Sequence, residues 1–416
     1  SIRNVAVVGH GGCGKTQLIS ALLFAAGAVN RLGRVDDGTT VTDFDDESIA
    51  RRHTLASALA CAEWRGLKLN LIDTPGFANF LTDARSALRV VEAAIVAVDG
   101  VAGVEVQTEK LWNEAAALGL PRIVALNRMD RDRSSLPRTL EALQSHLDRA
   151  IVPVQLPVGE GKGFSGVVDL IAMRAFTFAP GSTAVMQEGE VPAGMAAEAA
   201  VARERLIEMV AEADEALMER FFAEGTLTQT ELRDGLRKAV VAGRIFPLVC
   251  TSGSAAMGLQ PLLDLVAAVV PSPAERPLPA LDAAGNATTV AALDAAPYSA
   301  FVWKTIADQF AGRITMLRVG SGVLTSDTSV HNATRDSSER LGHLLVLQGK
   351  TQTHVPALHA GDLGAVAKLK ETTTNDTLAE KATPIRFAPM AFPEAVLAYA
   401  IEPKSRGDED KISTSM

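Results

Sequence analysis

A glycine-rich segment near the start of the chain has the residue types and spacing of a phosphate-binding loop. The run GHGGCGKT, from Gly9 to Thr16, fits the pattern GxxxxGK[ST] and stands between an apolar, strand-like run and an amphipathic helical pattern. Glycines let successive backbone amides converge on phosphate oxygens, and the N-terminus of the following helix adds positive potential. Lys15 is therefore expected to reach the β- and γ-phosphates and Thr16 to bind Mg²⁺. The alternative is a structural glycine turn without a ligand.

Contacts between this loop and a nucleotide are expected to come mainly from the backbone. The residues expected to make them are His10, Gly11, Gly12, Cys13, Gly14, Lys15, Thr16 and Gln17. The side chains of His10 and Cys13 are interpreted as tolerated fillers, and a redox-sensing Cys13 is the minor alternative.

A second segment, DTPG from Asp73 to Gly76, follows the apolar run LKLNLI. Asp73 is thus expected at the carboxyl end of a strand, where ligands bind in open α/β sheets. We expect Asp73 to hold the metal through water and Gly76 to let a backbone amide approach the γ-phosphate. A DxxG pattern alone usually marks a surface turn, but its place one strand after Lys15 favours the nucleotide interpretation.

Two further segments have the pattern of a base-binding site. The run NRMD, from Asn127 to Asp130, ends an apolar stretch. A carboxylate there accepts both N1–H and the exocyclic amine of guanine, which adenine does not offer. The run resembles the NKxD guanine motif of GTPases, in which Arg128 replaces a lysine whose stem covers the base. The run CTSG ends a later apolar stretch, where GTPases carry a similar loop, and this resemblance implies that the amides of Ser252 and Gly253 contact guanine O6.

The elements that must position these residues alternate between β-branched runs and helical patterns from residue 4 to 130. This alternation is typical of a parallel sheet with crossover helices, so the predicted fold class is α/β. Frequent Pro and Gly residues, followed by helices expected at 195–223 and 228–242, indicate an inserted subdomain at about 152–245. The apolar run FPLVC after it predicts a further strand of the parallel sheet.

A Pro-rich segment at 271–281 predicts a linker to a second domain. From 298 to 378, short alternating runs separated by turn residues predict a small antiparallel β-barrel. The run AVLAYAIEP at 395–403 predicts one more strand, which cannot bury a face alone. We therefore expect the chain to be truncated inside a third domain.

The composition excludes several other classes of protein. With 416 residues, 47% of them apolar, the chain is expected to form two to four globular domains. Its net charge of −9 excludes a uniformly basic surface for nucleic-acid binding. An RNA partner would therefore bind local basic patches, and no DNA partner is expected. Three scattered cysteines predict a reducing, cytoplasmic setting, and we expect neither a membrane span nor a signal peptide.

The four motifs, in this order, resemble those of translational GTPases, and the resemblance extends to elongation factor G and its paralogues. The segments DFDDESIARRHTLASA, QLPVGEGKGFSGVVDLI and AGDLGAVAKLKETTTNDTL are similar to segments of that family. The resemblance implies GTP and GDP as nucleotides, Mg²⁺ as the metal and GTP hydrolysis as the reaction. It also implies a monomer in the cytoplasm that binds the ribosome through rRNA and stalk proteins.

The same resemblance implies domain boundaries and residue roles. Residues 1–275 would form the GTP-binding G domain with its insertion at about 152–245, residues 282–390 the β-barrel domain two, and residues 391–416 the start of domain three. The segment DFDDESIARRHTLASA would be the family's first switch, in which Thr54 completes the Mg²⁺ shell with Thr16 and Asp73. Lys15, Thr54 and Gly76 would act in hydrolysis.

The chain departs from the family directly after DTPG, where the activating histidine is replaced by Phe77. A phenyl ring neither hydrogen-bonds to the attacking water nor stabilises transition-state charge. Two interpretations stay open: a working GTPase, or a GTP-gated ribosome-binding paralogue with little or no hydrolysis. His53, in place of a branched aliphatic residue, is a candidate substitute for the imidazole, and the alternative is that it is a solvated residue of the first switch. A general P-loop ATPase is disfavoured by Asn127 and Asp130.

Two surfaces are candidates for macromolecular contacts. Basic residues of the second domain would form either an rRNA-facing patch or a solvated face: Lys304, Arg313, Arg318, Arg335, Arg340, Lys350, Lys368 and Lys370. The acidic helical tract at 188–224 is a candidate protein-docking surface, which the resemblance places near the ribosomal stalk.

Overall fold

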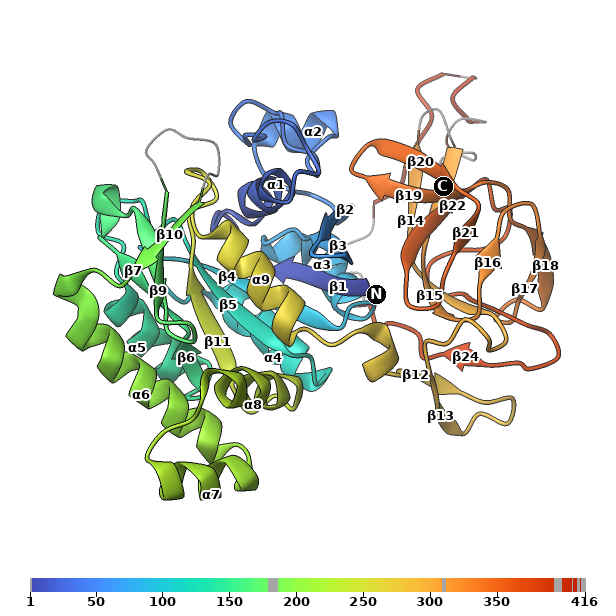
Figure 1. Cartoon of the computed structure of the whole chain (residues 1–416). Helices are drawn as coiled ribbons and strands as arrows, with labels where there is room; N and C mark the ends of the chain where they lie inside the picture. Colours follow the sequence, from blue (N-terminus) through green and yellow to red (C-terminus); the bar gives the residue numbers. More distant parts are fainter. Residues whose placement is uncertain are drawn as a thin grey trace.

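The computed structural model describes residues 2–178, 186–308, 312–392, 399–405, 407–409 and 412. Figure 1 shows an α/β lobe, coloured blue to yellow, beside a lobe of short strands, coloured orange to red. The chain passes between them at the 3-10 helix η4 (Pro273–Glu275) and the strand β12 (Leu278–Leu281). The predicted fold class is confirmed: a mostly parallel sheet with helices, followed by antiparallel β-structure.

The first lobe is organised around a sheet with the strand order β2-β3-β1-β4-β5-β11-β6. Neighbouring strands are parallel except that β2 runs antiparallel to β3 at the edge. The strands are β1 (Ile2–Val8), β2 (Ala58–Trp64), β3 (Leu67–Asp73), β4 (Ala93–Asp99), β5 (Arg122–Asn127), β6 (Ile151–Pro153) and β11 (Phe246–Cys250). Every residue of β4 and β5 is buried, which explains their continuous apolar runs in place of alternation.

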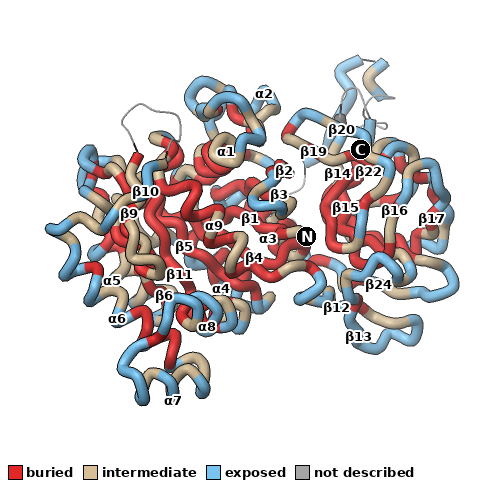
Figure 2. The backbone as a smooth tube through the Cα atoms, in the orientation of Figure 1, coloured by how far each residue is buried: buried red, intermediate tan, exposed pale blue. Residues whose placement is uncertain are grey.

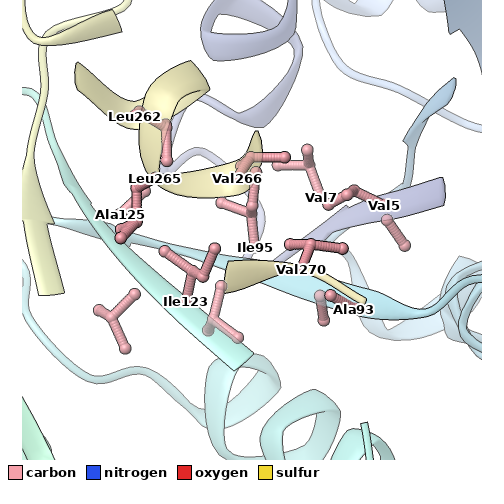
Figure 3. Packing of buried hydrophobic residues seen from close by; sticks show 14 of the residues in the cluster. Val5, Val7, Ala93, Ile95, Ile123, Ala125, Leu262, Leu265, Val266 and Val270 are labelled. Atoms are coloured by element: carbon pink, nitrogen blue, oxygen red, sulfur yellow. The ribbon is translucent and has the colours of Figure 1, made fainter. Parts of the chain in front are cut away.

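Helices cover this sheet and complete its core. They are α1 (Lys15–Ala25), α3 (Leu81–Leu88), α4 (Val106–Ala117), α5 (Leu136–His146) and α9 (Leu259–Val269), while the short helices α2 (Asp46–Arg51) and η1 (Ala78–Phe80) bury no apolar side chain. Figure 3 shows Val266 of α9 beside Ile95 and Val7 of the sheet. Burial of one such side chain stabilises the fold by about 1.5–3 kcal/mol. Figure 2 shows the buried backbone running through these strands and into the second lobe.

An inserted unit lies between β6 and β11. Its sheet has the order β10-β9-β8-β7. Its elements are β7 (Gln155–Val158), η2 (Gly161–Gly163), β8 (Gly166–Asp169), β9 (Arg174–Phe178), β10 (Met186–Glu190), η3 (Ala193–Met195), α6 (Ala196–Glu212), α7 (Glu215–Glu224) and α8 (Gln229–Val241). The single helix predicted at 195–223 was wrong. The Asp214 side chain accepts hydrogen bonds from the amides of Ala216 and Leu217, and this N-cap starts α7 as a separate helix.

The second lobe is a curled antiparallel sheet in the order β18-β17-β23-β14-β15-β22-β19-β20. Its strands are β14 (Ser299–Asp308), β15 (Gly312–Ser321), β17 (Ser329–Asn332), β18 (Ser337–Arg340), β19 (Leu344–Gln348), β20 (Thr351–Val355), β22 (Leu363–Ala367) and β23 (Thr377–Ala379). Smaller pairings join β16 (Leu324–Thr325) to β21 (Ala357–Leu358), and β12 to β13 (Ala287–Val290) and β24 (Arg386–Phe387). Because β12 pairs on both sides, the end of the predicted linker is a strand. Of the strand predicted at 395–403, residues 395–398 lie outside the described residues, and residues 399–403 do not form a strand.

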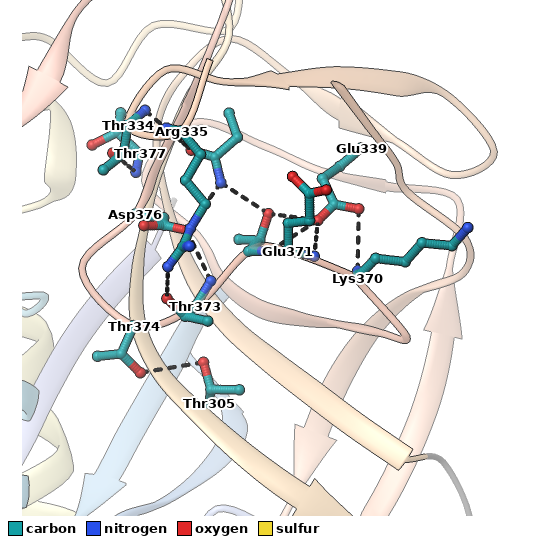
Figure 4. Close-up of polar contacts among 12 residues, drawn as sticks. Thr305, Thr334, Arg335, Glu339, Lys370, Glu371, Thr373, Thr374, Asp376 and Thr377 are labelled. Carbon is teal, nitrogen blue, oxygen red and sulfur yellow. Dashed lines mark hydrogen bonds and ion pairs between the residues drawn. The ribbon is translucent and has the colours of Figure 1, made fainter. Parts of the chain in front are cut away.

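Several cations of the expected basic patch are not free to face a partner. Lys304 and Arg318 are 8% and 1% exposed and pair with carboxylates of the first lobe. Figure 4 shows Arg335 directed at Asp376, with 2.6 Å between Nε and a carboxylate oxygen. Lys304 and Arg318 therefore do not belong to an exposed patch, because the contact between the lobes buries them, which an alternating strand pattern does not reveal. Arg335 is held by an ion pair within its own lobe. The remaining predicted basic residues are exposed: Arg313, Arg340, Lys350, Lys368 and Lys370.

Candidate functional site

The predicted motifs follow the carboxyl ends of β1, β3, β5 and β11, which meet at one edge of the sheet. They surround a pocket of about 460 Å³. The predicted residues that line it are Gly11, Gly12, Gly14, Lys15, Thr16, Gln17, His53, Thr54, Gly76, Phe77, Asn127 and Arg128. The other predicted residues contact this lining without being part of it: His10, Cys13, Asp73, Asp130, Ser252 and Gly253.

Gly14 and Gly76 are required by close approaches at the pocket. Gly14 has φ = 90° and stands before α1, and a Cβ there would meet the Asn127 amide nitrogen at 2.8 Å. A Cβ on Gly76 would fall onto Nζ of Lys15 and would meet the backbone nitrogen of Gly11 at 2.6 Å. The DTPG turn thus rests directly on the phosphate loop, as a γ-phosphate contact from both segments requires.

Lys15 occupies the end of the pocket next to Gly76. Its Nζ donates hydrogen bonds to the carbonyl oxygens of Gly9 at 3.0 Å and His10 at 2.9 Å, and the residue is 6% exposed. A buried ammonium beside a helix N-terminus is a binding site for anionic oxygens. This end of the pocket therefore suits the phosphates of a nucleotide.

The side chains of His10 and Cys13 are directed away from the pocket. Nδ1 of His10 accepts a hydrogen bond from the Gln107 amide at 3.3 Å, and its Nε2 lies 3.4 Å from a carboxylate oxygen of Glu105. Cys13 is 1% exposed, and burial raises the pKa of its thiol against the opposing charge of Lys15. A buried thiol that stays protonated is a poor redox sensor. Both residues can thus contribute only through the backbone.

Threonine and aspartate side chains gather below the phosphate end. The hydroxyl oxygens of Thr16 and Thr54 are 2.7 Å apart, and the Thr42 hydroxyl donates to Asp73 at 2.6 Å. Both carboxylate oxygens of Asp43 and Oδ1 of Asp73 are buried without a hydrogen-bond partner among the described residues. Buried carboxylate oxygens of this kind require a cation or a proton.

The electrostatics of these carboxylates agrees with a cation site. Burial and the neighbouring charge of Asp73 raise the pKa of Asp43 to about 7. Burial also raises the pKa of Asp73, against the hydrogen bond from Thr42. Hydroxyl and carboxylate oxygens are the ligands that Mg²⁺ prefers. The residues present therefore fit Mg²⁺.

The other end of the pocket is built by the loops after β5 and β11. Nδ2 of Asn127 donates to the carbonyl oxygen of Cys13 at 3.0 Å, and its Oδ1 accepts from the Gly253 amide at 3.1 Å. The Asp130 carboxylate accepts from the hydroxyls of Ser252 at 2.6 Å and Ser254 at 3.2 Å. Asn127 therefore joins the two loops to the phosphate loop.

These contacts differ from the prediction for the fourth motif. The amides of Ser252 and Gly253 were expected to reach guanine O6, but they donate to the carbonyl oxygen of Met257 and to Asn127. In this loop, Ser252 acts through its hydroxyl, which holds Asp130. Ser254 lines the pocket instead.

Arg128 covers the wall of the pocket between the base end and the phosphate loop. Its Nη1 donates to Asp99 at 2.9 Å, and a Cβ on Gly14 would meet its Nε at 3.3 Å. Burial works to raise the pKa of Asp99, but the Val101 amide and the Arg128 guanidinium outweigh it and lower the pKa. Arg128 thus keeps the covering position expected of a lysine stem and adds an ion pair.

Phe77 and His53 lie together at the phosphate end. Their ring centroids are 4.8 Å apart at an interplanar angle of 65°, an edge-to-face contact. A Cβ on Gly11 would meet the Phe77 ring at 2.7 Å, so the ring lies directly over the phosphate loop. Phe77 nevertheless remains 41% exposed. The ring thus forms part of the pocket wall and is not buried in the core.

Sequence reasoning missed several residues of the pocket. Asp43, Arg51, Arg52 and Ser254 all line it. Asp43 had a usable signal, since it is an acidic residue in the same segment as Thr54. Ser254 had a weaker one, because it stands two residues beyond the predicted Ser252. The exposed arginines carry no pattern that separates them from an ordinary solvated helix end.

The phosphate loop between β1 and α1, on a mostly parallel sheet, defines a P-loop nucleotide-binding domain. Residues 1–272 match the family described as the elongation factor Tu GTP binding domain. The chain therefore belongs to the translational GTPases. Residues 297–381 match elongation factor G domain 2, which confirms the family that the motifs resembled.

A solved crystal structure from Thermus thermophilus is similar to nearly the whole chain. The TM-score is 0.85 and the sequence identity 34%. The match covers 99% of this chain and 59% of that chain, so the chain spans about three fifths of the length of that protein. No helix in the described part of the chain is long and apolar enough to cross a membrane.

Proposed function

We propose that this chain is the nucleotide-binding part of an elongation-factor-G-like factor. It binds GTP with Mg²⁺, associates with the ribosome in that state, and leaves after hydrolysis to GDP and phosphate. The observation that carries the proposal is one pocket with Lys15 at one end and Asn127 at the other. An Asp130 carboxylate aligned by hydroxyls accepts from guanine and leaves adenine unmatched.

Different residues of the pocket bind the triphosphate, the base and the metal ion. Lys15 and the amides of the phosphate loop bind the triphosphate, while Asn127 holds the base loops against that loop. Thr16 and Thr54 would hold Mg²⁺ directly, and Asp73 through water, with Asp43 as the second buried carboxylate. When bound, the ion neutralises phosphate charge. The Thr54 hydroxyl at 2.7 Å from Thr16 gives the first switch a means to respond to the bound ion.

Nucleotide choice tests this proposal first. Fluorescent GTP, GDP and ATP analogues are titrated into the chain with Mg²⁺ present. We expect GTP and GDP to bind at least about 100-fold more tightly than ATP, and Asp130→Asn to remove most of that difference. An equal affinity for ATP would reject a guanine site.

Ribosome association is tested by sedimentation of the chain with purified ribosomes. We expect more binding with a non-hydrolysable GTP analogue than with GDP. The contacts proposed are rRNA for the second domain and stalk proteins for the acidic helices of the insertion, in a cytoplasmic monomer. Equal sedimentation in both nucleotide states would contradict a GTP-gated switch.

The presence of Phe77 favours a second candidate function, that of a GTP-gated ribosome-binding paralogue without appreciable hydrolysis. Its ring occupies the wall above Gly11 and offers the attacking water no hydrogen bond. Single-turnover hydrolysis by the full-length protein on ribosomes separates the two candidates. Fast turnover supports the GTPase. Tight GTP binding without turnover, partly rescued by Phe77→His, supports the paralogue.

A further inference from the structure

The phosphate end of the pocket contains one imidazole among the described lining residues, His53. It lies beside Thr54, whose hydroxyl is 2.7 Å from that of Thr16. It also contacts the ring of Phe77, which covers Gly11. These neighbours place His53 at the end of the pocket occupied by Lys15 and Gly76, away from Asn127.

The hydrogen bonding of His53 fixes which ring nitrogen can accept. Nδ1 is 2.9 Å from the carbonyl oxygen of Arg51, and a carbonyl oxygen only accepts, so Nδ1 must donate. In the neutral ring, Nε2 then carries the lone pair. Nε2 has no partner among the residues that the structure describes. It is therefore available to accept a hydrogen bond from water.

The other acceptors that line this pocket have different partners or positions. Asp43 belongs to the buried carboxylates that fit Mg²⁺. Oε1 of Gln17 accepts from the Val35 amide at 3.3 Å. The hydroxyl of Ser254 lies at the base end, on Asp130. The hydroxyls of Thr16 and Thr54 share a hydrogen bond, and the Asp36 carboxylate is 86% exposed beside Arg52. His53 is thus the side-chain acceptor that remains at the phosphate end of the described lining.

We infer that His53 is a catalytic residue that orients the attacking water through Nε2, and that Phe77 is the positioning residue that holds its ring. The inference rests on the proposed function, because it concerns hydrolysis of the bound GTP. The water oxygen forms a bond to the γ-phosphorus as the bond from that phosphorus to the β–γ bridging oxygen breaks. The electron pair leaves on GDP, and the two water protons go to inorganic phosphate and to solvent. The ring contributes orientation, which requires no net proton transfer to it.

The test is single-turnover GTP hydrolysis by the chain, paired with affinity for a fluorescent GTP analogue. His53→Ala is expected to slow hydrolysis by about 10- to 100-fold while the affinity changes less than about twofold. His53→Gln, which restores a side-chain acceptor, should recover part of the rate. His146→Ala, on the exposed end of α5, is the matched control and should behave as the wild type.

The positioning role of Phe77 is tested by the hydrolysis rate and GTP affinity of two Phe77 variants. Phe77→Leu should slow hydrolysis without loss of affinity, and Phe77→Tyr, which keeps the ring edge, should restore most of the rate. The inference is overturned if His53→Ala hydrolyses GTP at the wild-type rate, or if the wild type binds GTP and never hydrolyses it. Either result leaves nucleotide binding intact. Failure of the wild type to bind GTP would instead overturn the proposed function.

Discussion

Glu92 and Arg318 form an ion pair between the two lobes that is closed to solvent. Nη2 of Arg318 lies 2.6 Å from Oε1 of Glu92, and the side chains are 1% and 0% exposed. Nδ2 of Asn4 donates to the other carboxylate oxygen at 2.7 Å and to the carbonyl oxygen of Gly361 at 2.9 Å. Burial raises the pKa of Glu92, and the charge of Arg318 opposes that shift. The domain-two strand β15 is thus joined to the start of β4 by fully desolvated charges.

Removal of one partner of this pair should destabilise the protein more than removal of both. Arg318→Met leaves a buried carboxylate unpaired, which costs about 3–5 kcal/mol. The double variant Glu92→Gln with Arg318→Met leaves no buried charge and should recover much of that loss. Urea denaturation followed by circular dichroism measures the unfolding free energies of Arg318→Met, Glu92→Gln and the double variant. A double variant less stable than either single one would show that the pair itself is strongly stabilising.

A second contact between the lobes reaches the segment after Thr54 and the helix α3 after Phe77, which we propose are the switch segments that respond to the nucleotide. Nζ of Lys304 lies 3.0 Å from the carbonyl oxygen of Ser57 and 2.5 Å from Asp83, and Asp83 also accepts from the Ser57 amide at 2.6 Å. Ser57 follows Thr54, and Asp83 lies on α3 after Phe77. Lys304→Met should remove the contacts with Ser57 and Asp83 and raise the local opening rate of this segment. We therefore expect the Ser57 amide to exchange hydrogen at least about tenfold faster.

Native-state hydrogen exchange with and without GTP measures the effect of Lys304→Met. The matched control is Lys370→Met, which removes an exposed lysine whose backbone amide donates to Glu339 within the same domain. We expect the control to leave exchange at β2 and α3 unchanged. Protection of Ser57 equal to that of the wild type would show that domain two does not hold the switch segments through this lysine.

The parts of the site that sequence predicted are those that a local pattern determines. The phosphate loop around Lys15 and the DTPG turn are contiguous segments, each placed by the strand before it. The carboxyl ends of parallel strands meet at one edge, so their convergence followed from the α/β alternation alone. Asn127 and Asp130 were found in the same way, because they end a buried strand.

The parts that sequence did not predict depend on contacts between distant segments. Asp43 stands in the same segment as Thr54, but its part in the cation site depends on the burial that places its charge near Asp73. Lys304 and Arg318 have the alternating context of exposed strand residues, and packing between the lobes buries them. The break before α7 depended on whether Asp214 caps a new helix, a choice that helical periodicity does not contain.

The contact between Gly11 and Phe77 predicts a paired effect. A Cβ at position 11 would meet the phenyl ring at 2.7 Å, so Gly11→Ala should displace Phe77 and weaken GTP binding by about tenfold. In a Phe77→Ala background the same Cβ finds space, and Gly11→Ala should then have little effect. The four proteins of this double-mutant cycle are the wild type, Gly11→Ala, Phe77→Ala and the double variant. A fluorescent GTP analogue is titrated into each of them. Additive losses would mean that the two residues act independently.

Asp43 provides the test of the cation site. If Asp43 and Asp73 together hold Mg²⁺, Asp43→Asn should reduce the dependence of nucleotide affinity on the metal, because one of two buried charges is lost. We expect the ratio of GDP affinities with Mg²⁺ and with EDTA to fall by about tenfold in the variant, since one charged contact is worth about 1.5–3 kcal/mol at most. Asp36→Asn is the matched control, because Asp36 lines the same pocket with a side chain that is 86% exposed. A ratio that Asp43→Asn leaves unchanged, or one that Asp36→Asn lowers equally, would place the ion away from Asp43 and leave its buried carboxylate to be neutralised by a proton.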